Sequence, residues 1–180
     1  MKFILFYFFT FSLIFILIYF TYFLYSSSYL NQKTIKGNCW IAKKIGHTYI
    51  LSVNNHCELV SSIFDLAKCE NIKSGQISGL GAINEATLRY FNPDTKKYSD
   101  KTFYGQKEIA NLIGNISLKD NLPYLHLHIT LSDENYKSIA GHLMNAKISG
   151  ACELFIKTIP SMSVKRSFSK SIGLNIYNFN

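Results

Sequence analysis

The chain has 180 residues, about the length of one domain, which excludes a large multidomain protein. Hydrophobic residues make up 48% and charged residues 17%, so the chain is too apolar to be disordered. Its 19 basic and 11 acidic residues give a net charge of +8, which favours an anionic partner, either nucleic acid or lipid headgroups, or serves solubility alone.

The first predicted element is an uncharged apolar segment, Phe3 to Tyr25. As a helix it would be roughly 34 Å long, and a bilayer core is about 30 Å thick. The sequence therefore predicts a transmembrane anchor or signal segment over residues 1–30, and a protein anchored in the membrane by a single span. A cleaved signal peptide, with Ser26 and Ser28 at a poor cleavage site, and AT-rich DNA upstream of a later start are the alternative interpretations.

The charges beside this segment leave its orientation open. Lys2 precedes it, and four lysines follow it: Lys33, Lys36, Lys43 and Lys44. The positive-inside bias would keep the following domain in the cytoplasm, whereas a signal anchor or an exported protein would place it on the other side.

Residues 37–180 are predicted to form one domain, since no linker rich in Pro, Gly or Ser interrupts them. Tyr49–Val53 has the pattern of a strand. Apolar residues at helical spacing then predict a helix that starts near Asn55 and Glu58, which have the spacing of a capping box, and ends at Asn71–Gly75. Six strand-like runs follow: Gln76–Ser78, Ala86–Phe91, Ile109–Ile116, Tyr124–Leu131, Ser138–Met144 and Ile148–Thr158.

Turn signals at Asn92–Asp94 and Asp133–Asn135 separate some of these runs. One early helix and many short strands predict an α+β fold, a single domain with a largely antiparallel sheet and a flanking helix, preceded by one hydrophobic N-terminal helix. Gly79 and Gly81 lack the third small residue of a dinucleotide-binding loop, so they are expected to form a bulge or tight turn.

The four cysteines do not have the spacing of a zinc–thiolate site, because Cys39, Cys57 and Cys69 form no CxxC pair. Cys152 lies in an apolar strand-like run and is expected to be buried as a small hydrophobic residue.

The segment Tyr124–Leu131 alternates strictly between apolar and polar residues. Its leucines and isoleucine therefore share one face of a strand, whereas His126, His128 and Thr130 share the other. Because neutral imidazoles are the commonest ligands of transition metals, the two histidines form a candidate metal site. The alternative is a solvated strand face that carries histidines by chance.

His142 would complete this site across a predicted hairpin. If the turn is centred on Asn135, His142 opposes His128 and the three histidines converge, as in zinc sites that keep a fourth position open. If the turn is centred half a step earlier, His142 opposes Leu127 and points into the core. Gly141 is expected to let the opposing backbone approach closely.

Several short motifs occur in a characteristic order: Gly79-Leu80-Gly81-Ala82, Leu112-Ile113-Gly114-Asn115-Ile116, His126-Leu127-His128, Gly141-His142-Leu143, Glu153-Leu154-Phe155, Arg166 and Gly173-Leu174. Over roughly residues 47–178 they resemble the plants-and-prokaryotes-conserved (PPC) domain in its prokaryotic branch. The resemblance implies an antiparallel sheet, assembly as a homotrimer, and a metal site at His126, His128 and His142. Zinc is the expected cofactor, with other transition metals as alternatives.

Two departures from the plant members limit what the resemblance implies. The plant partner motif Gly-Arg-Phe-Glu-Ile-Leu is replaced by Gly105-Gln106-Lys107-Glu108-Ile109-Ala110, and no AT-hook is present. The partner function of the plant proteins is therefore not transferred, and minor-groove recognition loses its best-supported device.

Three functions remain consistent with the sequence. The first is a trimeric interaction or DNA-binding module, with non-specific phosphate contacts from Lys96, Lys97 and Lys101. The second is a metal-dependent enzyme or small-ligand-binding protein, with Glu108 or Glu153 as the candidate base. The third is a membrane-tethered trimer in which the metal only stabilises assembly. Catalytic residues stay unknown, and the sequence does not decide whether the chain is an enzyme.

Overall fold

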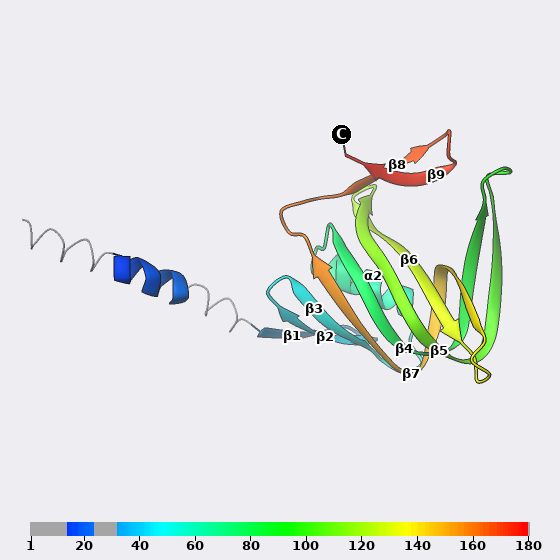
Figure 1. Cartoon of the computed structure of the whole chain (residues 1–180), viewed down its shortest axis with the longest axis horizontal. Helices are drawn as coiled ribbons and strands as arrows, with labels where there is room; N and C mark the ends of the chain where they lie inside the picture. The colour runs from blue at the N-terminus through cyan, green and yellow to red at the C-terminus, as the bar shows by residue number, and fades with distance from the viewer. Residues whose placement is uncertain (1–13, 24–31, 180) are drawn as a thin grey trace, which may run out of the picture.

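The computed structural model describes residues 14–23, which are helical, and residues 32–179 (Figure 1). In the second range, the helix α2 spans Leu59–Cys69. The strands are β1 (Gln32–Lys36), β2 (Trp40–Ile45), β3 (Thr48–Val53), β4 (Gly75–Asn92), β5 (Lys97–Lys119), β6 (Leu122–Ser132), β7 (Ser138–Thr158), β8 (Lys165–Ser169) and β9 (Leu174–Asn178).

These strands form one sheet in the order β1-β2-β3-β7-β4-β5-β8-β9, and β6 pairs with both β5 and β7. All the strand pairs are antiparallel except a contact between Leu118 of β5 and Lys165 of β8. The predicted single domain with a mostly antiparallel sheet is confirmed. Strands β4, β5, β6 and β7 close a circuit of pairs, because β6 bridges the two strands that flank β4.

Long bent strands replace several of the short runs expected from the sequence. The runs predicted at Gln76–Ser78 and Ala86–Phe91 both belong to β4, and the two runs predicted after residue 138 both belong to β7. The pairing of β4 with β5 shifts register between Gly79 and Gly81, so the bulge expected at these glycines is confirmed. A bulge lets one strand continue through a bend, whereas the sequence pattern at that bend resembles the end of a strand.

The helix α2 covers the buried face of the sheet and packs against β6 and β7 (Figure 1). Its apolar side is buried through Leu59, Ile63, Leu66 and Ala67, the helical spacing that the sequence predicts. Cys152 is also buried in this core, as expected, and burial raises the pKa of its thiol to about 12.

The N-terminus of α2 differs from the predicted capping box. Glu58 is itself the N-cap residue, and its carboxylate accepts hydrogen bonds from the backbone N–H groups of Val60 and Ser61. The same carboxylate accepts a hydrogen bond from the N–H of Ala146 in β7, at 3.1 Å. Asn55 instead accepts a hydrogen bond from the N–H of Gly150. Glu58 therefore both caps the helix and ties it to the sheet.

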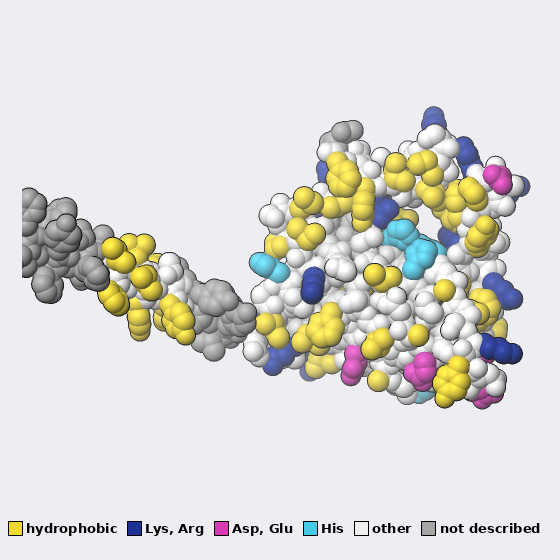
Figure 2. Space-filling view, viewed as in Figure 1, with side chains coloured by type: hydrophobic (Ala, Val, Ile, Leu, Met, Phe, Trp, Pro, Cys, Tyr) yellow, Lys and Arg dark blue, Asp and Glu magenta, His cyan; other side chains and the backbone are white. Residues whose placement is uncertain are grey.

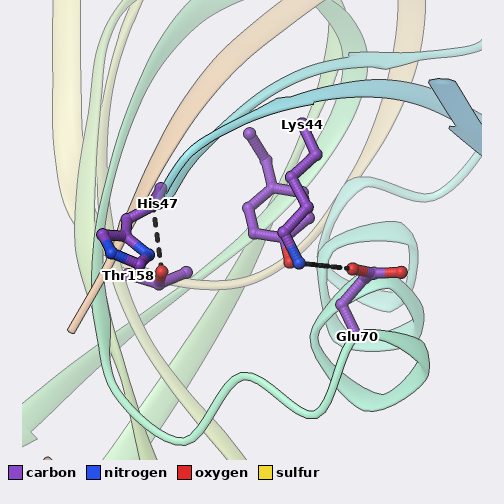
Figure 3. Close-up of polar contacts among 5 residues, drawn as sticks. Lys44, His47, Glu70 and Thr158 are labelled. Carbon is purple, nitrogen blue, oxygen red and sulfur yellow. Dashed lines mark hydrogen bonds and ion pairs between the residues drawn. The ribbon is translucent and has the colours of Figure 1, made fainter. Parts of the chain in front are cut away.

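The other end of α2 is fixed by a polar contact with the β2–β3 hairpin (Figure 3). Lys44 Nζ lies 3.1 Å from Glu70 Oε2, and the buried Tyr49 hydroxyl donates a hydrogen bond of 2.9 Å to the same oxygen. Burial alone would raise the pKa of Glu70, but the hydrogen bonds from Tyr49 and Lys44 outweigh it and lower that pKa. The carboxylate is therefore ionised where it joins helix and hairpin.

A disulfide bond links Cys39, just before β2, to Cys57, just before the helix cap. The backbone N–H of Asn54 also donates to the carbonyl oxygen of Cys39, so the bridge joins segments that already lie together. The sequence pattern excluded a zinc–thiolate site at these cysteines and did not indicate the bridge.

The predicted membrane anchor at Phe3–Tyr25 requires correction. Within residues 14–23 and 32–179, no helix has the length and apolar character needed to cross a membrane. The predicted membrane-anchored localisation is therefore wrong on this finding, and the rest of the predicted span lies outside the described residues.

Candidate metal centre

Three histidines converge on the face of the sheet opposite α2. On β6 the alternation places Leu127 and Ile129 in the core, which orients His126 and His128 to the other face. His142 arrives from β7, and potential ligand nitrogens of the three rings lie within 4.8 Å of one another. Figure 2 shows histidine side chains gathered on one face, next to an opening in the molecular surface.

The loop between β6 and β7 has an odd number of residues, which this convergence requires. Ser132 pairs with Ser138 and His128 pairs with His142, so the intervening loop is centred on Asn135. The Asp133 carboxylate accepts hydrogen bonds from the N–H groups of Asn135 and Lys137, which fixes the turn. The predicted register of His128 and His142 is therefore confirmed.

His142 has a cross-strand partner on each side of β7. It pairs with His128 of β6 on one side and with Arg89 of β4 on the other. Arg89 in turn pairs with Asp100 of β5, and His128 pairs with Ile113, farther along β5. Across these four strands, one continuous row of cross-strand neighbours therefore runs through Ile113, His128, His142, Arg89 and Asp100, and it includes two of the three histidines.

The surroundings of His126 and His142 favour the neutral form of these imidazoles, which is the form that binds metals. Burial, followed by the charges of His126, His128 and Arg89, lowers the pKa of His142 to about 4. Burial and the charge of Arg166 also lower the pKa of His126. Neutral imidazoles have a free lone pair on one ring nitrogen, so this donor set fits zinc or another transition ion.

An ion pair flanks His142. Arg89 donates two hydrogen bonds of 2.7 Å to the two carboxylate oxygens of Asp100, and its guanidinium lies 4.8 Å from the centre of the Tyr98 ring. Asp100 acts on His142 electrostatically and partly offsets the lowering of its pKa. Of the acidic groups described, this carboxylate is the one whose charge acts on His142, and it is already paired with Arg89.

A second arginine flanks His126. Arg166 of β8 donates hydrogen bonds to Ser117, to Asn115 and to the carbonyl oxygen of Asn175. Since Asn115 is the cross-strand partner of His126, Arg166 lies beside that histidine on the same face. The ordered PPC motifs of the sequence include Arg166 and Asn115, whereas no sequence pattern pointed to Arg89 or Asp100.

The candidate bases named from the sequence lie elsewhere. Glu153 and His142 lie toward opposite ends of β7, and Glu153 pairs with Leu80 and Ser52. Glu108 lines a cavity of about 620 Å³ between β5 and the β6–β7 hairpin. Neither carboxylate is among the groups that shift the histidine pKa values.

Exposed apolar side chains extend across the face that carries the histidines. Ile50 pairs with Phe155, Phe155 with Ser78, Ser78 with Ile113, and Ile113 with His128, so all five positions share that face. We call the exposed large residues of this surface the outer apolar face: Ile41, Ile50, Leu80, Ile113 and Phe155. Glu153 lies among them.

The β4–β5 and β8–β9 hairpins approach each other beyond the histidines (Figure 1, Figure 2). Lys96 at the tip of the β4–β5 hairpin donates a hydrogen bond of 3.2 Å to the carbonyl oxygen of Lys170. Lys97 and Lys101 lie on the same exposed ribbon, so the three lysines considered for phosphate contacts share one hairpin.

Solved structures similar to this chain include one named as a DNA-binding protein and one named as a metal-containing protein. A candidate DNA-binding protein from Bacteroides thetaiotaomicron is 48% identical, with a TM-score of 0.77 over 79% of this chain and 99% of that one. A metal-containing protein from Archaeoglobus fulgidus is 29% identical, with a TM-score of 0.70 over 75% and 95% of the two chains.

A plant- and prokaryote-conserved protein from Pyrococcus horikoshii is 28% identical, with a TM-score of 0.70 over 80% of this chain and 97% of that one. No curated protein matches the chain. The family model of the Plants and Prokaryotes Conserved (PCC) domain, the domain abbreviated PPC above, matches residues 41–160. The chain therefore belongs to the Plants and Prokaryotes Conserved domain family.

Proposed function

We propose that the protein binds a divalent transition metal, with zinc as the best fit, through His126, His128 and His142. The observation that carries the proposal is the convergence of three imidazoles, two of them with lowered pKa values, within 4.8 Å. The name of the Archaeoglobus protein as metal-containing supports it. Three histidine ligands leave a coordination position open, and a metal with an open position polarises water or a bound ligand there.

Three charged side chains of the chain flank this centre. Arg89 and Asp100 hold each other beside His142, and Arg166 is fixed beside His126. The charges of these groups act on His142 and His126, and they set the electrostatic field that an incoming ligand meets. We infer that the centre serves to bind a small ligand, and that any chemistry depends on the metal.

Metal analysis of the purified full chain tests this proposal. Wild type should carry close to one equivalent of zinc per chain after loading and desalting, whereas His128→Ala and His142→Ala should carry almost none. His47→Ala is the matched control, because its histidine lies on the β2–β3 hairpin outside the cluster. Equal zinc in all four proteins would mean that the histidines are only a polar strand face.

We also propose that the outer apolar face is covered by other copies of the chain in a homotrimer. Five large apolar side chains exposed on one face exceed what a monomer ordinarily leaves in water, and they adjoin the histidines. The number three comes from the resemblance to the PPC family. A metal centre at the margin of this face would then lie close to a subunit boundary.

DNA is a second candidate partner, favoured by the name of the Bacteroides protein and by the three lysines of the β4–β5 hairpin. Binding to a labelled 20-base-pair duplex should then weaken steeply with salt. Replacing Lys96, Lys97 and Lys101 by Gln should reduce the log–log salt slope by about 3, while the control Lys68→Gln, on α2, should not. Absence of binding at 50 mM salt would reject DNA as a partner.

A further inference from the structure

Arg166 carries a positive charge that no acidic side chain in the described part of the chain balances. Its Nε donates to Ser117 Oγ at 2.8 Å, its Nη2 to Asn115 Oδ1 at 2.9 Å, and its Nη1 to the carbonyl oxygen of Asn175 at 2.9 Å. All three acceptors are uncharged. Within the described ranges, the ion pairs join other residues, so the guanidinium is held in place without being neutralised.

The guanidinium is also held between two aromatic rings. Its central carbon lies 5.0 Å from the centre of the Tyr124 ring and 4.4 Å from that of Tyr177. A partly buried cation fixed by three hydrogen bonds and two ring faces has lost its conformational freedom before any ligand arrives. Preorganisation of this kind strengthens the binding of an anion, because its entropic cost has already been met by folding.

The Arg166 guanidinium lies on the same face of the sheet as the histidines, because two of its hydrogen-bond acceptors are on that face. Ser117 and Tyr124 are cross-strand partners, as are Asn115 and His126, and the residues of both pairs share the histidine face. On the other side, the charge of Arg89 is neutralised by its bidentate pair with Asp100. The net charge contributed by the arginines at this centre is therefore that of Arg166.

Three of the five N–H groups of Arg166 are used within the protein, which leaves two for a ligand. Arginine N–H groups match the spacing of carboxylate oxygens, and a metal held by three neutral histidines keeps its full positive charge. We propose that the centre binds a small carboxylate, with one part on the open position of the metal and the other on Arg166. This inference rests on the proposed metal centre.

A purely structural role for Arg166 is the competing explanation, since it joins β5 to the C-terminal hairpin. Such a role would affect thermal stability and leave the preference between charged and neutral ligands unchanged. The test must therefore compare ligands of different charge on the same folded protein.

Cobalt(II) provides the probe, because its visible absorption changes when a ligand enters the open position. The full chain, loaded with cobalt, is titrated with acetate, oxalate, inorganic phosphate and neutral imidazole. Arg166→Gln should weaken acetate and oxalate binding about 10- to 100-fold, the range of charge-assisted hydrogen bonds, and leave imidazole binding unchanged. Arg166→Lys should recover part of the loss, and the neighbouring Lys165→Gln should match wild type.

Each outcome decides a separate point. Equal carboxylate affinities in wild type and in a folded, cobalt-loaded Arg166→Gln would overturn the role of Arg166. Phosphate that binds more tightly than either carboxylate would overturn the ligand class. A wild-type protein that takes up no cobalt would overturn the metal centre itself, which distinguishes that failure from the first two.

Discussion

Gly114 of β5 pairs with Leu127 of β6, between the two histidines of that strand. A Cβ atom at this position would meet the backbone oxygen of His126 and would lie 2.5 Å from Leu127 Cδ2. The backbone cannot yield without moving the strand that carries two of the histidines. Gly114→Ala is therefore expected to lower the free energy of unfolding by about 1–3 kcal/mol and to weaken zinc binding.

Gly141→Ala is the matched control, although Gly141 precedes His142. A Cβ there would lie 3.4 Å from Leu88 Cβ, an ordinary van der Waals distance. The close approach that the sequence suggested for Gly141 thus belongs to Gly114. Denaturant unfolding and competitive zinc titration of both variants check the prediction, and equal losses in the two would contradict it.

The pKa of His142 predicts how the metal-free protein responds to pH. The pKa of His142 is about 4 in the folded chain, against 6.5 for an ordinary histidine, so between these two values the unfolded state binds the proton first. Stability of the metal-free chain should therefore fall as the pH drops from about 6.5 toward 4, and His142 should add no further loss below that. Urea unfolding in the presence of a chelator at pH 7 and pH 5 measures the loss.

His142→Gln is expected to flatten this dependence without abolishing it, because burial and Arg166 lower the pKa of His126 as well. His56→Gln, outside the cluster, serves as the control. A full pH slope retained in His142→Gln would show that another group is responsible.

At the scale of elements, the attachment of α2 depends on one carboxylate. Glu58 Oε1 accepts hydrogen bonds of 3.0 Å from Val60 N and 3.1 Å from Ala146 N. Glu58→Ala leaves donors of both the helix and β7 without this acceptor, so it should lower the free energy of unfolding by about 1–3 kcal/mol. Thermal and urea denaturation measure the effect, with Glu134→Ala in the β6–β7 loop as the control. A loss no larger than that of the control would contradict this role.

The elements that sequence patterns identify are those whose faces differ sharply in polarity. The alternation around His126 and the helical spacing of Leu59, Ile63 and Leu66 both follow from burial of one face, and both are confirmed. Strands β1, β2, β8 and β9 were not identified from the sequence, because they are short and mix polar and apolar residues.

In the candidate site, too, local sequence patterns predict some positions and not others. The convergence of the histidines follows from alternation and loop parity, which are local. Arg89 and Asp100 lie beside His142 only through the register of β4 with β7, strands far apart in the sequence whose pairing contains register shifts. Arg166 likewise reaches Asn115 from a strand 51 residues away, and local patterns specify neither contact.

For the whole molecule, the proposed trimer predicts a mass. Light scattering of the full chain should give about three times 20.6 kDa at micromolar concentration. Phe155→Glu and Ile113→Glu place a charge on the outer apolar face, which should shift the mass toward that of one chain while the fold is kept. Leu122→Glu, at an exposed position near the β5–β6 turn, should leave the mass unchanged. A wild-type monomer would reject the assembly.

The place of β7 has a consequence for biosynthesis. This strand is the last long one to leave the ribosome, yet it inserts between β3 and β4 and pairs Thr48 with Lys157. Until it emerges, the edges of β3 and β4 have no partner, and contacts so distant in sequence form slowly. Unpaired edges are the sites where nascent chains associate wrongly. We therefore expect the yield of folded protein to depend on chaperones and on the rate of translation before Thr158.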